Sequence, residues 1–141
     1  MPSKENETLV SRYVDEVLNR GNLDLLDEIC ARDYKRYLSP ASSPLSLDEQ
    51  RQRLAAIRIA FPTLSAKVEE IICDNGIVAF RAIVRGTQSG PFLGLPATGK
   101  DFTISALDMV SVKHGKFAEH WGGPDLFALL QQLGADIRPS S

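Results

Sequence analysis

The sequence lacks the features that mark nucleic-acid-binding, membrane and exported proteins. Lys and Arg number 16 against 18 Asp and Glu, so the formal net charge is −2, whereas a nucleic-acid-binding protein usually carries a basic excess that replaces phosphate counterions. No apolar run approaches the ~20 residues that cross a bilayer, and the polar N-terminus has no apolar stretch resembling a signal peptide. We therefore expect no nucleic-acid or membrane partner and a cytoplasmic location.

Cysteine is also scarce, and internal repeats are absent. The two cysteines, Cys30 and Cys73, lie far apart and lack the CxxC or Cys/His spacing of a metal or redox site. We expect both to be reduced and buried, and to pack as small hydrophobic residues. The sequence thus predicts no metal site.

What the chain does have is the composition of an ordinary globular protein. Its 141 residues are 43% hydrophobic and 24% charged, which is too apolar for a disordered chain. A domain of this length buries roughly 68% of its unfolded surface, enough to build a core without disulfides. We predict a single domain over residues 1–141, with an ordered core at about 6–135.

Helical periodicity dominates the N-terminal part of the chain. Apolar residues, Tyr13 among them, recur at three- and four-residue spacing over residues 6–29, with a break at Gly21-Asn22. Residues 30–46 show little period and contain two prolines, which predicts a loop.

Two further helices are bounded by capping signals. Ser46 and Glu49 match the reciprocal capping pattern that opens a helix, and Pro62 predicts that this helix stops near residue 61. Asp125 predicts the start of a last helix, which Gly134 ends.

Between these last two helices the apolar period changes to 2, which predicts strands. Helices first and antiparallel strands afterwards indicate an α+β fold. The predicted strands are about 64–74, 77–88, 101–113 and 116–121, with turns at Asn75-Gly76 and His114-Gly115, a Gly/Pro-rich loop at 89–100 and a sheet-breaking Gly122-Gly123-Pro124.

The strand at 101–113 carries an acid on an apolar face. Asp108 lies at an even-numbered position of this strand, and side chains two apart share one face of a strand. The other even-numbered positions are apolar: Phe102, Ile104, Ala106, Val110 and Val112. A desolvated, unpaired carboxyl has a raised pKa, which suits a general acid or base. The alternative is a structural carboxylate, hydrogen-bonded in the core or paired with Arg or Lys.

The register of the following hairpin decides what faces this acid. A two-residue turn at His114-Gly115 predicts that Trp121 lies opposite Asp108, with Glu119 on the same face and His120 on the other face. A turn longer by one residue reverses this and turns His120 inward. Glu119 is then a second inward acid or a solvated rim residue, and Trp121 is a stacking wall for a ligand or part of the core.

One motif resembles a nucleotide-binding loop but fails two tests. Residues 94–100 match GxxxxGK, yet Asp101 stands where Ser or Thr must hold magnesium. The loop also leads into a predicted strand and not into a helix whose N-terminus would cradle phosphate. We interpret it as a turn between strands.

Several segments together resemble the SnoaL-like polyketide cyclase (ester cyclase) family over about residues 7–135. The segments are NRGNLD at 19–24, GTQSGPFLGLPATGK at 86–100, Asp108, GKFAEHW at 115–121 and LQQLG at 130–134. The resemblance implies a nuclear-transport-factor-2-like fold, an α+β cone in which a curved antiparallel sheet and N-terminal helices enclose a pocket. It also implies ring closure by intramolecular aldol condensation of a hydrophobic carbonyl (polyketide-like) substrate, without metal or cofactor, with Asp108 as acid/base.

The resemblance also implies a set of pocket residues and a homodimer. The residues predicted to line the pocket are Gln88, Tyr37, Trp121, Glu119, Tyr13 and Phe92. Many family members have histidine where this chain has Gln88, and often also where it has Tyr37. Glutamine cannot relay a proton at neutral pH. The outward sheet face bearing Leu107 and Met109 needs a cover, which fits a homodimer.

Three functions therefore remain open from the sequence. The first is a cofactor-independent lyase or isomerase of the polyketide cyclase type. The second is a non-catalytic small-molecule-binding protein of the same fold, for which the missing histidine argues. The third is a cofactor-independent epoxide hydrolase or hydroxylase.

Overall fold

The fold is a single curved sheet with helices packed on one face. The computed structural model describes residues 3–136. In chain order the elements are α1 (Ser3–Arg12), η1 (Tyr13–Asn19), η2 (Leu23–Leu25), α2 (Leu26–Ile29), β1 (Cys30–Arg36), α3 (Leu47–Ala60), β2 (Ser65–Asp74), β3 (Ile77–Thr87), β4 (Asp101–Lys113), β5 (Lys116–Pro124) and α4 (Leu126–Gln132).

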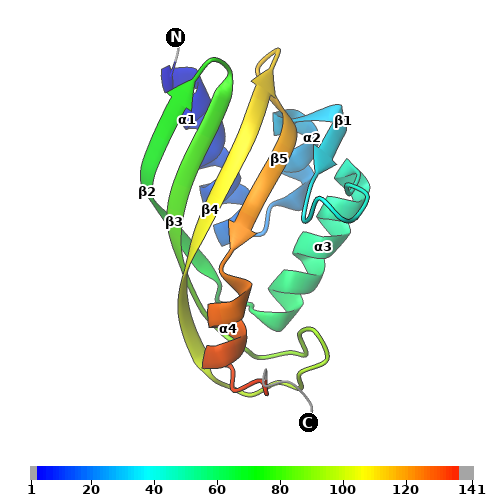
Figure 1. Cartoon of the computed structure of the whole chain (residues 1–141), viewed down its shortest axis with the longest axis vertical. Helices are drawn as coiled ribbons and strands as arrows, with labels where there is room; N and C mark the ends of the chain where they lie inside the picture. Colours follow the sequence, from blue (N-terminus) through cyan, green and yellow to red (C-terminus); the bar gives the residue numbers. More distant parts are fainter. Residues whose placement is uncertain (1–2, 137–141) are drawn as a thin grey trace.

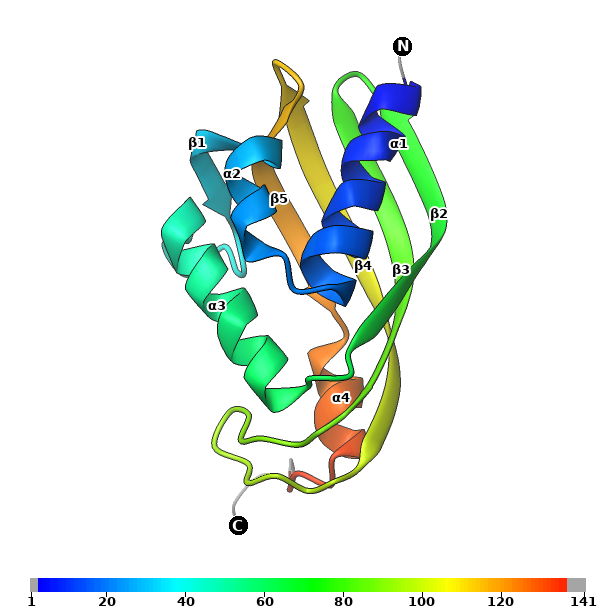
Figure 2. The same ribbon diagram turned by 180° about the vertical axis from the view of Figure 1, so that it is seen from behind.

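The five strands form one sheet in the order β1-β5-β4-β3-β2. Strands β2 to β5 are an antiparallel meander, whereas β1 joins the edge parallel to β5. Figure 1 shows the uncovered face of the sheet, and Figure 2 shows α1, α2 and α3 lying across the other face. The predicted α+β class with N-terminal helices and a curved antiparallel sheet is confirmed.

Local sequence signals set most element boundaries as predicted. Ser46 caps α3 in a capping box, in which its Oγ accepts from the Glu49 amide at 3.2 Å and its own amide donates to the Glu49 carboxylate at 2.9 Å. In the β2–β3 turn, Asn75 and Gly76 adopt φ of 52° and 78°, the left-handed pair that a two-residue hairpin requires. Asp125 caps α4 by accepting from the Ala128 amide at 3.0 Å.

The loop predicted at residues 30–46 is wrong for its first part, because Cys30–Arg36 is strand β1. This segment has no alternating apolar pattern, and its strand geometry comes from pairing with β5 far along the chain. A backbone bridge between Arg36 and Leu45, with N···O distances of 2.9 and 2.8 Å, closes the loop that follows. Tertiary hydrogen bonding here overrides local propensity.

Two other predictions need correction. The first helix changes to π geometry at Tyr13–Asn19 before the break at Gly21, an irregularity that periodicity does not reveal. Strand β5 continues through the expected sheet-breaking Gly122-Gly123 to Pro124.

The core lies between the helices and the inner face of the sheet. Its main cluster joins α1, η1 and α2 to β3, β4 and β5 through residues such as Val10, Val17, Val78 and Val110. A second cluster, which includes Phe61, Phe102 and Leu133, packs α4 against the far end of β4. Cys30 is buried as expected, but Cys73 is only half-buried.

Candidate active site

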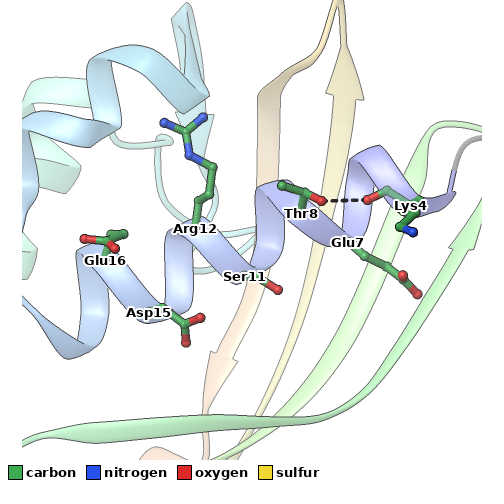
Figure 3. A pocket seen from close by; sticks show the side chains of 7 residues that line it. All are labelled: Lys4, Glu7, Thr8, Ser11, Arg12, Asp15 and Glu16. Atoms are coloured by element: carbon green, nitrogen blue, oxygen red, sulfur yellow. Dashed lines mark hydrogen bonds between the residues drawn. The ribbon is translucent and has the colours of Figure 1, made fainter.

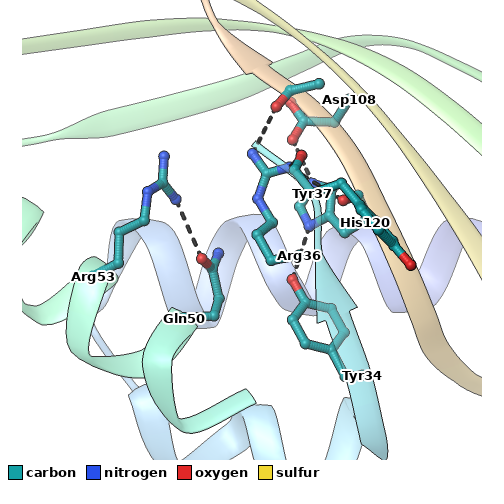
Figure 4. Close-up of polar contacts among 8 residues, drawn as sticks. Tyr34, Arg36, Tyr37, Gln50, Arg53, Asp108 and His120 are labelled. Carbon is teal, nitrogen blue, oxygen red and sulfur yellow. Dashed lines mark hydrogen bonds and ion pairs between the residues drawn. The ribbon is translucent and has the colours of Figure 1, made fainter. Parts of the chain in front are cut away.

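The centre of the site is the pair formed by Asp108 and His120 on the inner face of the sheet. Asp108 lies on β4 between the buried Ala106 and Val110, as the alternation predicts. Its Oδ2 lies 2.6 Å from Nε2 of His120 on β5 (Figure 4). The side chains are 11% and 2% exposed, so the contact is largely shielded from solvent. The carboxylate is therefore hydrogen-bonded within the core, as one form of the structural alternative predicts, and its partner is a histidine and not an Arg or Lys.

A β-bulge turns His120 inward, contrary to the predicted register. The two-residue turn is present, with Val112 opposite Phe117, but one additional residue of β5 then shifts the ladder, so that Ser111 pairs with Glu119. Asp108 consequently faces Gly122 and not Trp121. The bulge is held by the Ser111 hydroxyl, which accepts from the Glu119 amide at 3.1 Å. A bulge exchanges the faces of all residues beyond it, and the sequence carries no clear signal for it.

Two tyrosines, Tyr34 on β1 and Tyr13 on η1, contact the His120 ring. The hydroxyl of Tyr34 on β1 lies 3.1 Å from Nδ1 of His120, and the ring of Tyr13 packs edge-on with centroids 5.8 Å apart. Burial raises the pKa of both tyrosines, and the Asp108 charge adds to the effect on Tyr13. Both therefore remain phenols at neutral pH.

These surroundings fix the protonation of the histidine. Burial lowers the pKa of His120, and the hydrogen bond and charge of Asp108 offset that effect only in part. A neutral imidazole donates through one nitrogen and accepts through the other. Because Tyr34 can donate to Nδ1, Nε2–H is left to donate to the Asp108 carboxylate. The chain Tyr34→His120→Asp108 thus orients Oδ2, while Oδ1 has no hydrogen-bond partner among residues 3–136.

A buried arginine lies beside this chain. Arg36 on β1 is 2% exposed and donates to the carbonyl oxygens of Tyr37, His120 and Gly122 at 3.1, 3.3 and 2.7 Å. Gly122 has a φ of +87°, and a Cβ there would collide with the Leu107 carbonyl oxygen. Only glycine therefore brings this carbonyl to the guanidinium.

Helix α3 adds two polar side chains that face the same region. Gln50 is 1% exposed on the inner face of α3, and Arg53 one turn later is half-buried and donates to the Gln50 Oε1 at 3.3 Å. Burial and the neighbouring charge of Arg36 both lower the pKa of Arg53. Figure 4 shows the two side chains on the α3 side of the site, across from Arg36 and Asp108.

The structure brings only two of the predicted site residues, Asp108 and Tyr13, to this centre. Tyr37, Trp121 and Glu119 gather instead on the other side of β5. The rings of Tyr37 and Trp121 stack with centroids 5.7 Å apart and 9° between planes, and the Tyr37 hydroxyl is 3.5 Å from the Glu119 carboxylate. The predicted inward position of Trp121 opposite Asp108 is wrong, because the bulge moves it to the outer face.

Gln88 and Phe92 belong to the Gly/Pro-rich loop at the far end of the molecule. The buried Gln88 amide donates to the carbonyls of Gly90 and Leu95 and accepts from Thr98. Its hydrogen-bonding capacity is thus used to shape the loop. Phe92 packs edge-on against Phe61 with centroids 5.0 Å apart.

The surface of the molecule carries two open hollows. One, of about 450 Å³, runs over the uncovered face of the sheet and is lined by apolar residues such as Ile72, Leu107, Met109 and Trp121. Asp108 and Gly122 also contribute to its lining, so this hollow borders the centre. The other, of about 340 Å³, follows α1 and η1 and is lined by polar, mostly exposed residues (Figure 3). Within residues 3–136, no three His, Cys, Asp or Glu side chains gather where they could hold a metal ion. No helix of that range is long and apolar enough to span a membrane.

Sequence reasoning missed four residues of the centre in addition to the orientation of His120. Tyr34 and Arg36 lie on the strand that was interpreted as a loop. The sequence does indicate that Gln50 faces inward, because it lies three residues after Leu47 and four before Leu54 on the apolar stripe of α3. Arg53 lies three residues further along the same side of the helix. Polar residues on such a stripe indicate either a buried network or a site.

The chain is similar to proteins with named activities and to solved structures. The family model described as SnoaL-like polyketide cyclase matches residues 8–133. The aklanonic acid methyl ester cyclase DauD of Streptomyces sp. (strain C5) is 27% identical over 132 residues, which cover 89% of this chain and 80% of that protein. TsrD from Streptomyces laurentii has a TM-score of 0.86 at 26% identity, covering 96% of this chain and 99% of its own. IdmH from Streptomyces antibioticus has a TM-score of 0.80 at 31% identity, covering 94% and 99%.

Proposed function

Because this chain belongs to the SnoaL-like polyketide cyclase family, we propose that it closes a ring in a hydrophobic, polyketide-like carbonyl compound, with Asp108 as the acid/base. The observation that carries the proposal is the 2.6 Å contact between Asp108 and His120 on the inner face of the sheet. A carboxylate with one oxygen anchored and the other without a protein partner is oriented for proton transfer.

The proposed reaction is an intramolecular aldol closure. Oδ1 of Asp108 takes a proton from the carbon next to a carbonyl, and the electrons of the C–H bond move to the carbonyl oxygen as an enolate. The enolate carbon attacks a second carbonyl of the same molecule, and Asp108 returns the proton to the resulting alkoxide. His120 and Tyr34 keep the carboxylate in place throughout, which holds the reacting groups in a near-attack geometry.

The substrate class follows from the relatives. Two curated relatives, DauD and DnrD of Streptomyces peucetius, are both named aklanonic acid methyl ester cyclases, each at 27% identity. These names support a polyketide-like methyl ester as the kind of molecule on which this chain acts. They also favour the cyclase over the non-catalytic binding protein and the hydrolase or hydroxylase.

The test is turnover of aklanonic acid methyl ester by wild type and Asp108→Asn. Ring closure conserves mass, so the product is a new chromatographic peak of unchanged mass. We expect Asp108→Asn to fold normally and to lose at least ~10²-fold in kcat, the low end for general acid–base catalysis. Asp101→Asn, at the exposed end of the same strand, is the matched control and should retain activity. Equal turnover by wild type and Asp108→Asn contradicts the proposal, and recovery of bound ligand without conversion favours the binding protein.

We also propose that two copies pair through the uncovered face of the sheet. Ile72, Leu107 and Met109 are 67%, 63% and 41% exposed there, and they line the apolar hollow of about 450 Å³. A contiguous apolar patch on a sheet favours a self-complementary, two-fold contact.

A further inference from the structure

Two buried N–H groups near the Asp108–His120 pair have no acceptor. The Nε of Arg36 and the Nε2 of Gln50 lack a hydrogen-bond partner within residues 3–136, although these residues are only 2% and 1% exposed. Buried donors are normally paired, and an unpaired one costs much of its lost hydration. Each therefore calls for an acceptor that the folded chain does not supply.

The charges of the same region do not balance. Arg36 is surrounded by three carbonyl oxygens, which are neutral. Among the residues that the structure describes, the Arg53 guanidinium hydrogen-bonds to Gln50, which is also neutral. Neither guanidinium forms an ion pair with any carboxylate among residues 3–136. With His120 neutral, the negative charge of Asp108 lies beside two positive ones.

The unused groups share one region and one chemical character. Arg53 reaches Gln50 on α3, and Arg36 bonds the His120 carbonyl on β5. The charge of Arg36 lowers the pKa of Arg53, and the charge of Asp108 raises it. In Figure 4 the Gln50 and Arg53 side chains extend from α3 on one side, and Arg36 is drawn between them and His120. Apart from Oδ1 of Asp108, which the proposed function assigns to proton transfer, the unpaired buried groups are donors, so a complementary ligand presents acceptor oxygens to them, preferably with negative charge.

We propose that Arg36, Gln50 and Arg53 form a subsite for an anionic oxygen group, a carboxylate or an enolate, on the molecule that binds beside Asp108. The inference rests on the proposed function for its catalytic meaning, because an enolate oxygen forms when Asp108 removes the neighbouring proton. Donors that are already oriented stabilise that developing charge without reorganising. A carboxylate also presents negatively charged acceptor oxygen, so it can serve as a stable probe of the subsite.

The test is calorimetric binding of 2-naphthoate and its neutral analogue, 2-naphthamide, to the full-length protein. We expect wild type to bind 2-naphthoate at least tenfold more tightly than 2-naphthamide. Arg53→Gln should abolish this preference. Arg85→Gln makes the same charge change at an exposed position of β3 and should preserve it. Equal affinity for the two probes in wild type, or an undiminished preference in Arg53→Gln, overturns the inference.

A second variant separates binding from folding. Gln50→Leu removes an unpartnered buried donor, Nε2, but also the Oε1 acceptor of the hydrogen bond from Arg53. These two effects oppose each other, so the midpoint of urea unfolding should change little, while 2-naphthoate affinity falls at least threefold. A lower midpoint with unchanged affinity would assign Gln50 to the fold and overturn its place in the subsite.

The binding test of the subsite can be read separately from the turnover test of Asp108. Asp108→Asn should keep the preference for 2-naphthoate, since recognition of an oxyanion needs no proton transfer. Loss of turnover in Asp108→Asn without any discrimination between the probes would overturn the subsite alone. Discrimination that depends on Arg53, with turnover unaffected by Asp108→Asn, would overturn the proposed acid/base role alone.

Discussion

Consecutive residues of β5 lie in opposite chemical environments. His120 is 1% exposed and connects Tyr34 to Asp108 on the inner face, whereas Trp121 lies on the uncovered face, stacked on Tyr37. The inner group is desolvated and each member depends on the next. The outer group is half-exposed and held by packing. Two groups built from similar aromatic and acidic residues thus differ in their environment through burial, and one bulge in β5 decides which of them is buried.

The largest expected effect comes from breaking the inner group. His120→Leu leaves the Asp108 carboxylate and the Tyr34 hydroxyl without their partner, which should lower the free energy of unfolding by about 3 kcal/mol. Trp121→Leu on the outer face should cost about 1 kcal/mol, the value of a stacked aromatic pair. Urea denaturation at neutral pH measures both changes.

A double variant sharpens the interpretation. In Asp108→Leu/His120→Leu the unpaired carboxylate is gone, so the protein should be more stable than His120→Leu alone. If the single and double variants unfold at the same urea concentration, the cost does not come from the isolated carboxylate.

The next largest effect concerns the outer face. Leu107→Lys/Met109→Lys places two like charges in each copy of the proposed contact and should weaken dimerisation at least ~100-fold, about 2.7 kcal/mol. Light scattering after size exclusion should then report the 15.5 kDa monomer, with turnover per chain retained. A wild type that is already monomeric at micromolar concentration would contradict the proposed dimer.

The smallest effect is the response of the inner group to pH. The folded pKa of His120 lies below its usual value of 6.5, so below about pH 6.5 the unfolded chain binds a proton that the folded chain does not. The free energy of unfolding should therefore decrease as the pH is lowered below about 6.5. This group contributes at most about 1.4 kcal/mol per pH unit to the decrease.

Two matched histidine variants check the assignment. His120→Asn should remove this contribution to the slope, whereas His114→Asn, in the exposed turn of the β4–β5 hairpin, should leave it unchanged. A slope that survives in His120→Asn would place the titrating group elsewhere.

Much of the fold could be predicted because its signals are local. The capping box at Ser46, the hairpin at Asn75-Gly76 and the alternation around Asp108 each depend on neighbours within a few residues. Strand β1 could not be predicted in this way, because Tyr34 and Arg36 become part of a strand only by pairing with β5.

The site was less predictable than the fold for the same physical reason. Placing Asp108 needed only the period of one strand. Placing His120 needed the register of two strands, and a single bulge reverses that register. Placing Gln50 and Arg53 required knowing how a third element, α3, packs against the two strands. Their significance appears only once Nε of Arg36 and Nε2 of Gln50 are known to lack acceptors.

The parallel pairing of β1 with β5 links the two ends of the domain. Tyr34 and His120 are 86 residues apart in the sequence, so their hydrogen bond closes a long loop of the chain. Closing so long a loop is entropically demanding, and contacts of high sequence separation slow folding. The meander from β2 to β5 needs no such closure. Asp108 and His120 therefore belong to a unit assembled from short-range contacts, while Tyr34 and Arg36, which hold His120 and its carbonyl, are added only when β1 pairs with β5.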